Sequence, residues 1–199
     1  MKNLDSLFLI TGMLNKNEQI FIHGKRVAGI ACAIAEKMQY CDKGIRQIRL
    51  AAFFHDIGKI EVPEEILNKP GVLNESELAI VRRHPELGYQ LLKDIKPESI
   101  AAEVVLQHHE RLDGSGYPFG LRVKDINPVT RIISVADVIE TMVSPQVYRP
   151  ALSMDVALQE IKQNSGLLYD TKVVDAVLAV IGGMVNQKEF NEVLIKRFM

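Results

Sequence analysis

The sequence predicts an all-helical protein, and three observations support this. Apolar residues recur every three or four positions along most of the chain, as expected for helices with one buried face. Turn signals at Pro70-Gly71, at the glycine-rich run 113–118 and at Asn127-Pro128 separate the periodic segments. No pair of alternating segments resembles a strand pair. We therefore expect a compact helical bundle with additional C-terminal helices.

The first half of the chain contains one long apolar stripe and one clear helix start. The stripe extends back to Gln19 and His23. The Asn74-Glu75-Ser76-Glu77 segment has the form of a capping box, which predicts a helix beginning there. Pro85 should end or restart that helix, because proline lacks the backbone donor that a helix interior needs. The stripe itself comprises Val27, Ile30, Ala31, Ile34, Ala35 and Met38.

The second half repeats the same helical spacing. Apolar residues follow the i, i+3, i+4, i+7 pattern from Ala101 and again from Val129. His109 and Asp137 stand at the ends of these two runs, at positions that continue the pattern. After Pro150 we expect three further helices. Their expected N-caps are Ser153 and Asp170, and their expected stops are Gly166 and Gly182.

Composition excludes several classes of protein. The 24 basic residues are balanced by 25 acidic ones, which argues against binding to long nucleic acids. The longest apolar stretch, 177–185, is too short to cross a membrane and contains two glycines. Cys32 and Cys41 form no CxxC pair, which argues against a zinc knuckle and a disulfide framework. The short apolar segment 7–10 lacks a cleavage signal, so we expect a cytoplasmic protein.

Several histidines and one aspartate lie where the helical pattern would put core residues. His84, His108, His109 and Asp137 are examples. A buried imidazole or carboxylate loses hydration, and it needs partners to compensate for that loss. For any single histidine, ordinary core hydrogen bonding is an adequate explanation. The recurrence of such residues instead predicts a shared compensating charge, such as a metal cluster.

The short motifs around these residues resemble those of the HD-GYP domains. In chain order they are HGKRVA at 23–28, HDIGK at 55–59, KPG at 69–71, HPELG at 84–88, HHERLDGSGYP at 108–118 and ISVAD at 133–137. The resemblance implies an HD-type helical bundle. It also implies hydrolysis of cyclic di-GMP to linear pGpG, and in some members onward to GMP, through a hydroxide that bridges two metals.

The resemblance also assigns the metal ligands. Asp56 would bridge two divalent ions. His55, His84 and Asp137 would bind on one side, and His108 and His109 on the other. His23 matches a further family histidine, and either a ligand role or a supporting role remains open for it. Gln19 stands where members with a third metal have glutamate, so we expect two metals.

A ligand set of imidazoles and carboxylates without thiolate suits iron, manganese or catalytic zinc. The resemblance favours iron or manganese, with nickel or zinc as other occupants. It also implies that Asp56 and Lys59 are catalytic, with Lys59 contacting a substrate phosphate. Tyr117 and Arg149 are further expected substrate contacts.

Two departures from the family pattern keep alternatives open. Gln146 replaces an arginine, which removes a charged donor for phosphate, and Glu140 stands where aspartate is usual. A module that binds cyclic di-GMP with weak turnover therefore remains an alternative. So does an HD-superfamily phosphohydrolase that acts on another nucleotide.

The motifs also suggest a division of the chain. We expect a helical lead-in at 1–18, the catalytic domain at 19–178, and a C-terminal helical extension at 179–199 packed on that domain. Because the lead-in is short, we expect regulation to come from elsewhere. A homodimer mate, a diguanylate cyclase or a separate sensor protein therefore remain open as partners.

Overall fold

The computed structural model of the protein describes residue 12 and residues 17–94, 100–146 and 149–181. All regular structure in these ranges is helical, and only isolated β-bridges occur among them. The all-α prediction is confirmed. The elements are α2 (Glu18–Lys37), α3 (Asp42–Phe54), the 3₁₀ helix η1 (Ile57–Glu61), α4 (Glu64–Leu67), α5 (Glu75–Val81), α6 (His84–Leu92), α7 (Ala101–Gln107), α8 (Pro128–Val143), α9 (Met154–Gln163) and α10 (Thr171–Ile181).

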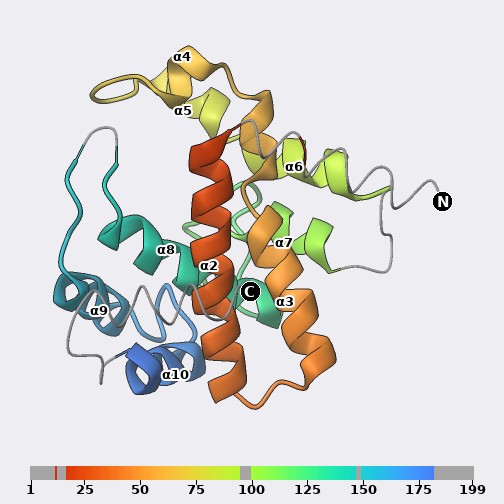
Figure 1. Ribbon diagram of the computed structural model, residues 1–199, viewed down its shortest axis with the longest axis vertical. Coiled ribbons are helices and arrows are strands. Elements are labelled where there is room, and N and C mark those ends of the chain that lie inside the picture. The colour runs from red at the N-terminus through yellow and green to blue at the C-terminus, as the bar shows by residue number, and fades with distance from the viewer. Residues whose placement is uncertain (1–11, 13–16, 95–99, 147–148, 182–199) are drawn as a thin grey trace.

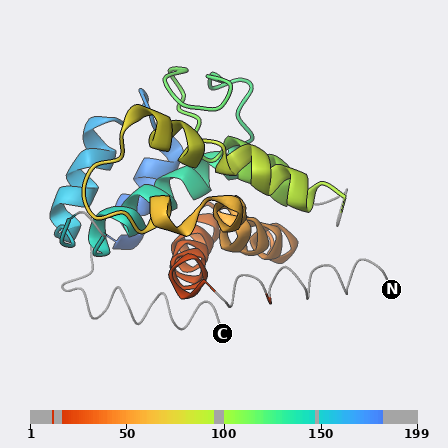
Figure 2. The same ribbon diagram turned by 90° about the horizontal axis from the view of Figure 1, so that it is seen from above.

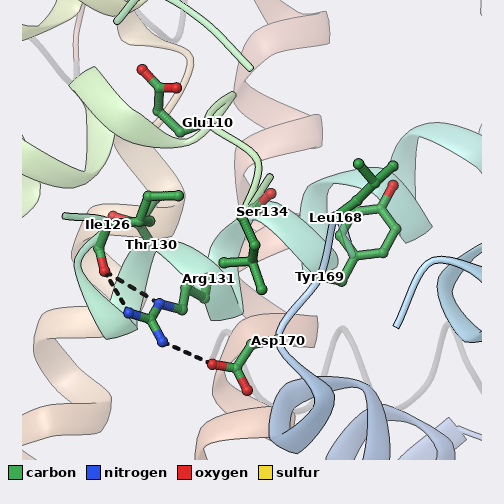
Figure 3. A pocket seen from close by; sticks show the side chains of 9 residues that line it. Glu110, Ile126, Thr130, Arg131, Ser134, Leu168, Tyr169 and Asp170 are labelled. Carbon is green, nitrogen blue, oxygen red and sulfur yellow. Dashed lines mark hydrogen bonds and ion pairs between the residues drawn. The ribbon is translucent and has the colours of Figure 1, made fainter. Parts of the chain in front are cut away.

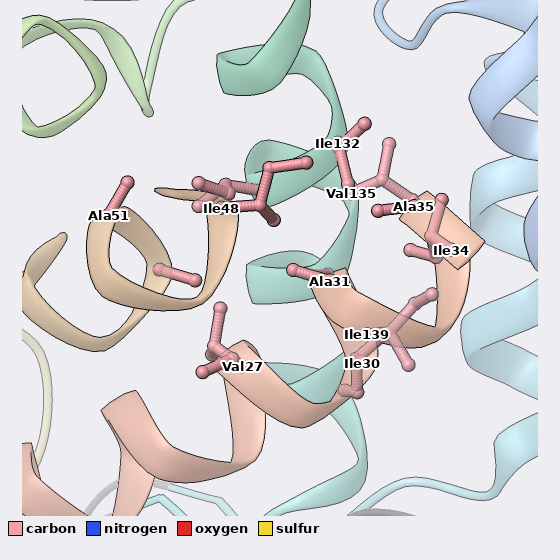
Figure 4. Close-up of a cluster of buried hydrophobic side chains, with 14 of the residues drawn as sticks. Val27, Ile30, Ala31, Ile34, Ala35, Ile48, Ala51, Ile132, Val135 and Ile139 are labelled. Carbon is pink, nitrogen blue, oxygen red and sulfur yellow. The ribbon is translucent and has the colours of Figure 1, made fainter. Parts of the chain in front are cut away.

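Helix α2 crosses the centre of the view in Figure 1 and packs against α3, α8 and α10. Its predicted apolar stripe is buried from Val27 to Ala35. Burial of this stripe is the main stabilising contribution of the helix, because the stripe leaves water on folding. Figure 4 shows side chains of this stripe meeting those of α3 and α8. The facing residues are Ile48 of α3 and Ile132, Val135 and Ile139 of α8.

Two glycines allow backbones to approach closely where three of the sequence motifs meet. A Cβ on Gly24 of α2 would lie 2.5 Å from the carbonyl oxygen of Phe53, so the small residue permits the close α2–α3 contact. A Cβ on Gly58 would lie 2.0 Å from the carbonyl oxygen of His84. Gly58 therefore lets η1 pack directly on α6. The two contacts bring the HGKRVA, HDIGK and HPELG motifs together.

The predicted helix starts are present. The Asn74 side chain accepts a hydrogen bond from the Glu77 backbone at 2.9 Å, and Glu77 Oε2 accepts one from the Asn74 backbone at 2.8 Å. This is the capping box expected from the sequence. Helix α5 ends at Val81, and α6 begins three residues later with Pro85 in its first turn. Ser153 caps α9, as expected.

The C-terminal part of the described chain contains α9 and α10, two of the three helices expected after Pro150. The third would fall in 182–199, outside the described residues, as does most of the expected 1–18 lead-in. Figure 2 shows the loop between α7 and α8 projecting on the side of the molecule away from α2. Among the described helices, none has both the length and the hydropathy needed to cross a bilayer.

Candidate metal centre

The predicted ligands come from several helices and converge on one buried point. His23 lies on α2, His55 follows the last residue of α3, and Asp56 precedes η1. The others lie on α6, at the end of α7 and on α8. Five of the predicted ligands are buried, whereas His23 and His109 are partly buried. The full set is His23, His55, Asp56, His84, His108, His109 and Asp137.

Asp56 lies at the centre, and its two carboxylate oxygens face different histidines. Oδ1 lies 3.2 Å from His84 Nε2 and 3.6 Å from His108 Nε2. Oδ2 lies 3.4 Å from both His23 Nε2 and His55 Nε2. The ligand atoms form two compact groups that share Asp56. This geometry suits a carboxylate that bridges two cations.

The grouping differs from the one expected from the sequence. His84 lies with His108 and His109 on the Oδ1 side, and not with His55. The reason is the packing of α6 against α7, which brings the first residue of α6 next to the end of α7. On the Oδ2 side, Asp137 Oδ1 lies 3.1 Å from His23 Nε2 and 3.6 Å from His55 Nε2.

Three histidines are oriented by the same kind of hydrogen bond. Nδ1 of His55, His84 and His108 lies 2.7 Å from the backbone carbonyl oxygen three residues earlier in each case. A carbonyl oxygen can only accept, so each Nδ1 carries the proton and donates it. In the neutral ring, Nε2 then presents a lone pair toward Asp56. Hydrogen bonds of this kind commonly orient histidine ligands of metals.

The converging nitrogens require a cation between them. Nε2 of His84 lies 3.1 Å from Nε2 of His108, and Nε2 of His23 lies 3.2 Å from Nε2 of His55. Two lone pairs at such distances repel unless a proton or a metal ion lies between them. Asp56 Oδ1 is also buried, and it lacks a well-aligned hydrogen bond among the described residues. Imidazole and carboxylate donors in this arrangement fit divalent metals.

The two sides of the centre differ electrostatically. Burial alone would lower the pKa of His55, but the charge of Asp56 and a hydrogen bond to Asp137 raise that pKa to about 9. On the other side, burial lowers the pKa of His108 to about 4, with repulsion from His55 and His84 acting in the same direction. The Oδ2 side therefore retains protons at neutral pH, whereas His108 is neutral.

Glu140 supports the Oδ2 side in a way that the sequence did not reveal. It is buried on α8, and its Oε2 accepts a hydrogen bond from His23 Nδ1 at 2.6 Å. Oε1 accepts one from the Ser144 hydroxyl at 2.6 Å, and Arg26 lies 3.4 Å from the same oxygen. The sequence signal that could have indicated this role is the spacing of Glu140 from Asp137, because residues three apart share a helical face.

The loop after α7 carries Tyr117 to the Oδ1 side. The Tyr117 ring stacks on His109, with centroids 4.6 Å apart and planes inclined by 22°. Buried Glu110 holds this loop, since its two oxygens accept hydrogen bonds from the backbones of Phe119 and Leu121 at 2.8 and 2.9 Å. Burial raises the pKa of Tyr117, so its hydroxyl remains a hydrogen-bond donor at neutral pH.

The expected phosphate-binding residues lie in different surroundings. Lys59 Nζ lies 2.5 Å from Asp56 Oδ2, directly at the centre. Arg149, in contrast, donates hydrogen bonds to the backbone carbonyls of Thr141, Met142 and Pro150. Its guanidinium therefore binds the end of α8 in this structure. Gln146 also donates to the Thr141 carbonyl, at 3.2 Å.

Glu110 also lines a small pocket, which Figure 3 shows. Ser134, Tyr169 and the Arg131–Asp170 ion pair, with an N···O distance of 2.9 Å, contribute to its lining. None of the predicted metal ligands lines it. The pocket is therefore separate from the centre around Asp56.

Comparison with known proteins agrees with the fold and the motifs. The family model described as HD domain matches residues 9–173. The chain is 40% identical over 156 residues to the cyclic di-GMP phosphodiesterase response regulator RpfG of Xanthomonas campestris pv. campestris, covering 77% of this chain and 41% of that protein. It is 38% identical over 181 residues to a cyclic di-GMP phosphodiesterase of Thermotoga maritima, covering 87% of this chain and 49% of that protein.

The chain thus spans about half, or less, of the length of these curated relatives. Among solved structures, the HDG"Y"P protein Bd1817 from Bdellovibrio bacteriovorus superimposes with a TM-score of 0.68. Its sequence identity is 23%, and the match covers 82% of this chain and 53% of that one, which shows a shared fold. By its family match and its motifs, the chain belongs to the HD domain family and, within it, to the HD-GYP proteins.

Proposed function

We propose that the chain is a metal-dependent phosphodiesterase that opens cyclic di-GMP to linear pGpG. The observation that carries the proposal is Asp56, whose two buried oxygens each face a separate group of histidine nitrogens. A carboxylate shared between two cations is the usual core of a two-metal phosphodiesterase site. The names of the curated relatives support cyclic di-GMP as the substrate.

The ligands divide between two ions. Asp56 Oδ1 with His84, His108 and His109 would hold one ion. Asp56 Oδ2 with His55, Asp137 and His23 would hold the other. The resemblance favours iron or manganese, and nickel or zinc also suit these donors. When bound, the two ions supply positive charge to the phosphoryl oxygens and make the attacking water more acidic.

The reaction is a hydrolysis. Water adds to phosphorus, the bond from phosphorus to one ribose oxygen breaks, and the leaving oxygen takes up a proton. Lys59 lies beside Asp56, where its ammonium group can bind a phosphate oxygen that gains charge in the transition state. Tyr117, protonated and stacked on His109, can donate a hydrogen bond to substrate on the other side.

The proposal extends to the end product, the role of Arg149, the location and the partners. A second hydrolysis of pGpG to GMP would use the same centre. Arg149 would become a phosphate contact only if substrate drew its guanidinium away from the α8 carbonyls. The signalling role of a cyclic dinucleotide favours the cytoplasm as the location. A homodimer mate, a diguanylate cyclase or a sensor protein would connect the activity to a signal.

The direct test is turnover with matched metal loading. The protein is purified anaerobically and reconstituted with iron or manganese, and cyclic di-GMP and pGpG are then followed by chromatography. We expect pGpG to form with the wild type and not with Asp56→Ala. Equal turnover by both proteins would refute the proposed centre.

Gln146 favours a second candidate, in which the module binds a cyclic dinucleotide without efficient turnover. Its amide donates to the Thr141 carbonyl and carries no charge, so it replaces neither the fork nor the charge of an arginine. Binding of cyclic di-GMP by calorimetry without pGpG formation would favour this candidate. Turnover of a different cyclic dinucleotide in a substrate panel would instead indicate another base preference.

A further inference from the structure

Most arginines around the centre already bind protein acceptors. Arg26 lies against Glu140 and donates to Ser144 at 3.2 Å. Arg111 donates to the Ser134 hydroxyl at 2.8 Å and to two backbone carbonyls. Arg149 donates to three backbone carbonyls at the end of α8 and just beyond it. Each of these guanidinium groups would have to leave a partner to bind substrate.

Arg82 differs from them. It lies between α5 and α6, two residues before His84, and its side chain is exposed. Its guanidinium carbon lies 5.3 Å from the centroid of the Tyr117 ring. Within residues 17–94, 100–146 and 149–181, no carboxylate, hydroxyl or carbonyl group accepts a hydrogen bond from this guanidinium. Arg82 therefore keeps its donors available while the aromatic ring positions its cation.

The position of Arg82 relative to the centre follows from two stacked contacts. Tyr117 stacks on His109, which belongs to the Oδ1 group of ligands. Arg82 lies over the same tyrosine ring. The guanidinium is thus one aromatic ring further from the centre than His109, too far to be a ligand. It is near enough to reach a second part of a substrate whose reacting phosphate lies at Asp56.

We infer that Arg82 binds the phosphate of the cyclic dinucleotide that is not being cleaved. The inference rests on the proposed function, because only a substrate with two phosphates has such a group. When one phosphate lies at the metal ligands, the other remains an anion without a partner there. An arginine fork matches two phosphate oxygens and gives charge-assisted hydrogen bonds. Arg82 would thus supply a cation from the N-terminal side of α6. The arginine that Gln146 replaces would instead have followed α8.

The test compares three variants of the full chain with the wild type. Arg82→Gln removes the charge, and Arg82→Lys keeps the charge but lacks the planar fork. Arg83→Gln is the matched control, because Arg83 is the exposed neighbour and its side chain makes no hydrogen bond, ion pair or ring contact with the described residues. Metal content and melting temperature are measured for each protein. Both should equal the wild-type values, because Arg82 is neither a ligand nor a core residue.

The decisive readout is steady-state kinetics with two substrates. Cyclic di-GMP has a second phosphate, whereas bis(p-nitrophenyl) phosphate is a diester with only one. We expect Arg82→Gln to raise KM for cyclic di-GMP about tenfold or more, the effect of losing charge-assisted hydrogen bonds. The ratio of kcat/KM for cyclic di-GMP to that for bis(p-nitrophenyl) phosphate should fall by a similar factor. For Arg82→Lys, KM and this ratio should lie between the values of the wild type and of Arg82→Gln. For Arg83→Gln, both should match the wild type.

Three outcomes would overturn the inference, and they are distinguishable. If the wild type cleaves cyclic di-GMP and Arg82→Gln has the same KM and the same ratio, Arg82 does not bind the second phosphate. An equal loss on both substrates would also exclude this role. If the wild type neither cleaves nor binds any cyclic dinucleotide, the proposed function fails, and the inference fails with it.

Discussion

Glu140 accepts a hydrogen bond from Nδ1 of His23 at 2.6 Å, although the two residues lie 117 positions apart in the sequence. Because a carboxylate can only accept, this contact keeps a proton on Nδ1. It also directs Nε2 of His23 toward Asp56 and Asp137, at 3.4 and 3.1 Å. Burial would raise the pKa of Glu140, but the hydrogen bond from His23 lowers it, so the carboxylate stays charged.

This contact makes Glu140 a positioning residue for the Oδ2 side. We predict that Glu140→Gln weakens Mn²⁺ binding at that side about tenfold, as for other groups that orient a histidine ligand. Glu140→Asp keeps the charge and should recover part of the affinity. Isothermal titration with Mn²⁺ measures the change. The control is Glu86→Gln, an exposed glutamate of α6. Unchanged affinity in Glu140→Gln would show that His23 needs no such support.

The approach of η1 to α6 depends on Gly58. A Cβ there would meet backbone atoms of His84 and Gly88 at 2.0 and 2.5 Å, and neither backbone can move away easily. We expect Gly58→Ala to lower the free energy of unfolding by about 3 kcal/mol and to displace Asp56 from His84. Urea denaturation measures the first effect, and metal content measures the second.

Gly44 offers a matched control for this substitution. It lies in α3, and the nearest atom to an added Cβ is a Tyr40 side-chain carbon at 3.2 Å. Gly44→Ala should therefore change stability by no more than about 1 kcal/mol, because alanine also favours the helix. If the two alanine variants were equally stable, the close packing of η1 on α6 would not be essential.

The pKa shifts predict how the stability of the metal-free protein depends on pH. The pKa of His55 is raised from 6.5 to about 9, and the pKa of Asp137 is lowered by its hydrogen bonds to His23 and His55 despite its burial. A raised pKa gives stability that is fully present below the unfolded value and is lost as pH rises through the folded value. For His55 this loss falls between pH 6.5 and about 9.

We therefore expect the melting temperature of the metal-free protein to fall as pH rises from 6.5 to 9. Added Mn²⁺ should remove most of this fall, because a bound cation replaces the proton among the same groups. In metal-free His55→Gln the fall should be smaller. Thermal denaturation followed by circular dichroism measures all three. A melting temperature that stays constant or rises over this range would contradict the assignment of charge to His55.

Much of the site could be predicted because helical periodicity and the site use the same residues. The stripe spacing assigns His108 and Asp137 to buried faces, and the structure buries both. The capping box correctly predicted the start of α5, and hence the short connection to His84. These features are local, so they are encoded within a few residues of each other.

Other features depend on contacts between distant elements. The grouping of His84 with His108 follows from the packing of α6 on α7, which periodicity does not specify. The Glu140–His23 contact joins α8 to α2, and no local pattern connects them. Arg149 lies at the end of α8, where it forms an antiparallel bridge with Gln146 and its guanidinium donates to backbone carbonyls. Spacing within one helix places Glu140 on the same face as Asp137, but it does not determine which residues of other helices that face contacts.

The measurement that most directly tests the shared role of Asp56 is the number of metal ions per chain after anaerobic reconstitution. We predict about two for the wild type, about one for His84→Ala and fewer than one for Asp56→Ala, since Asp56 is the residue common to the two groups of ligands. Inductively coupled plasma mass spectrometry on protein of known concentration gives these values. About two ions in the Asp56→Ala protein would contradict the bridging role and the two-metal centre built on it.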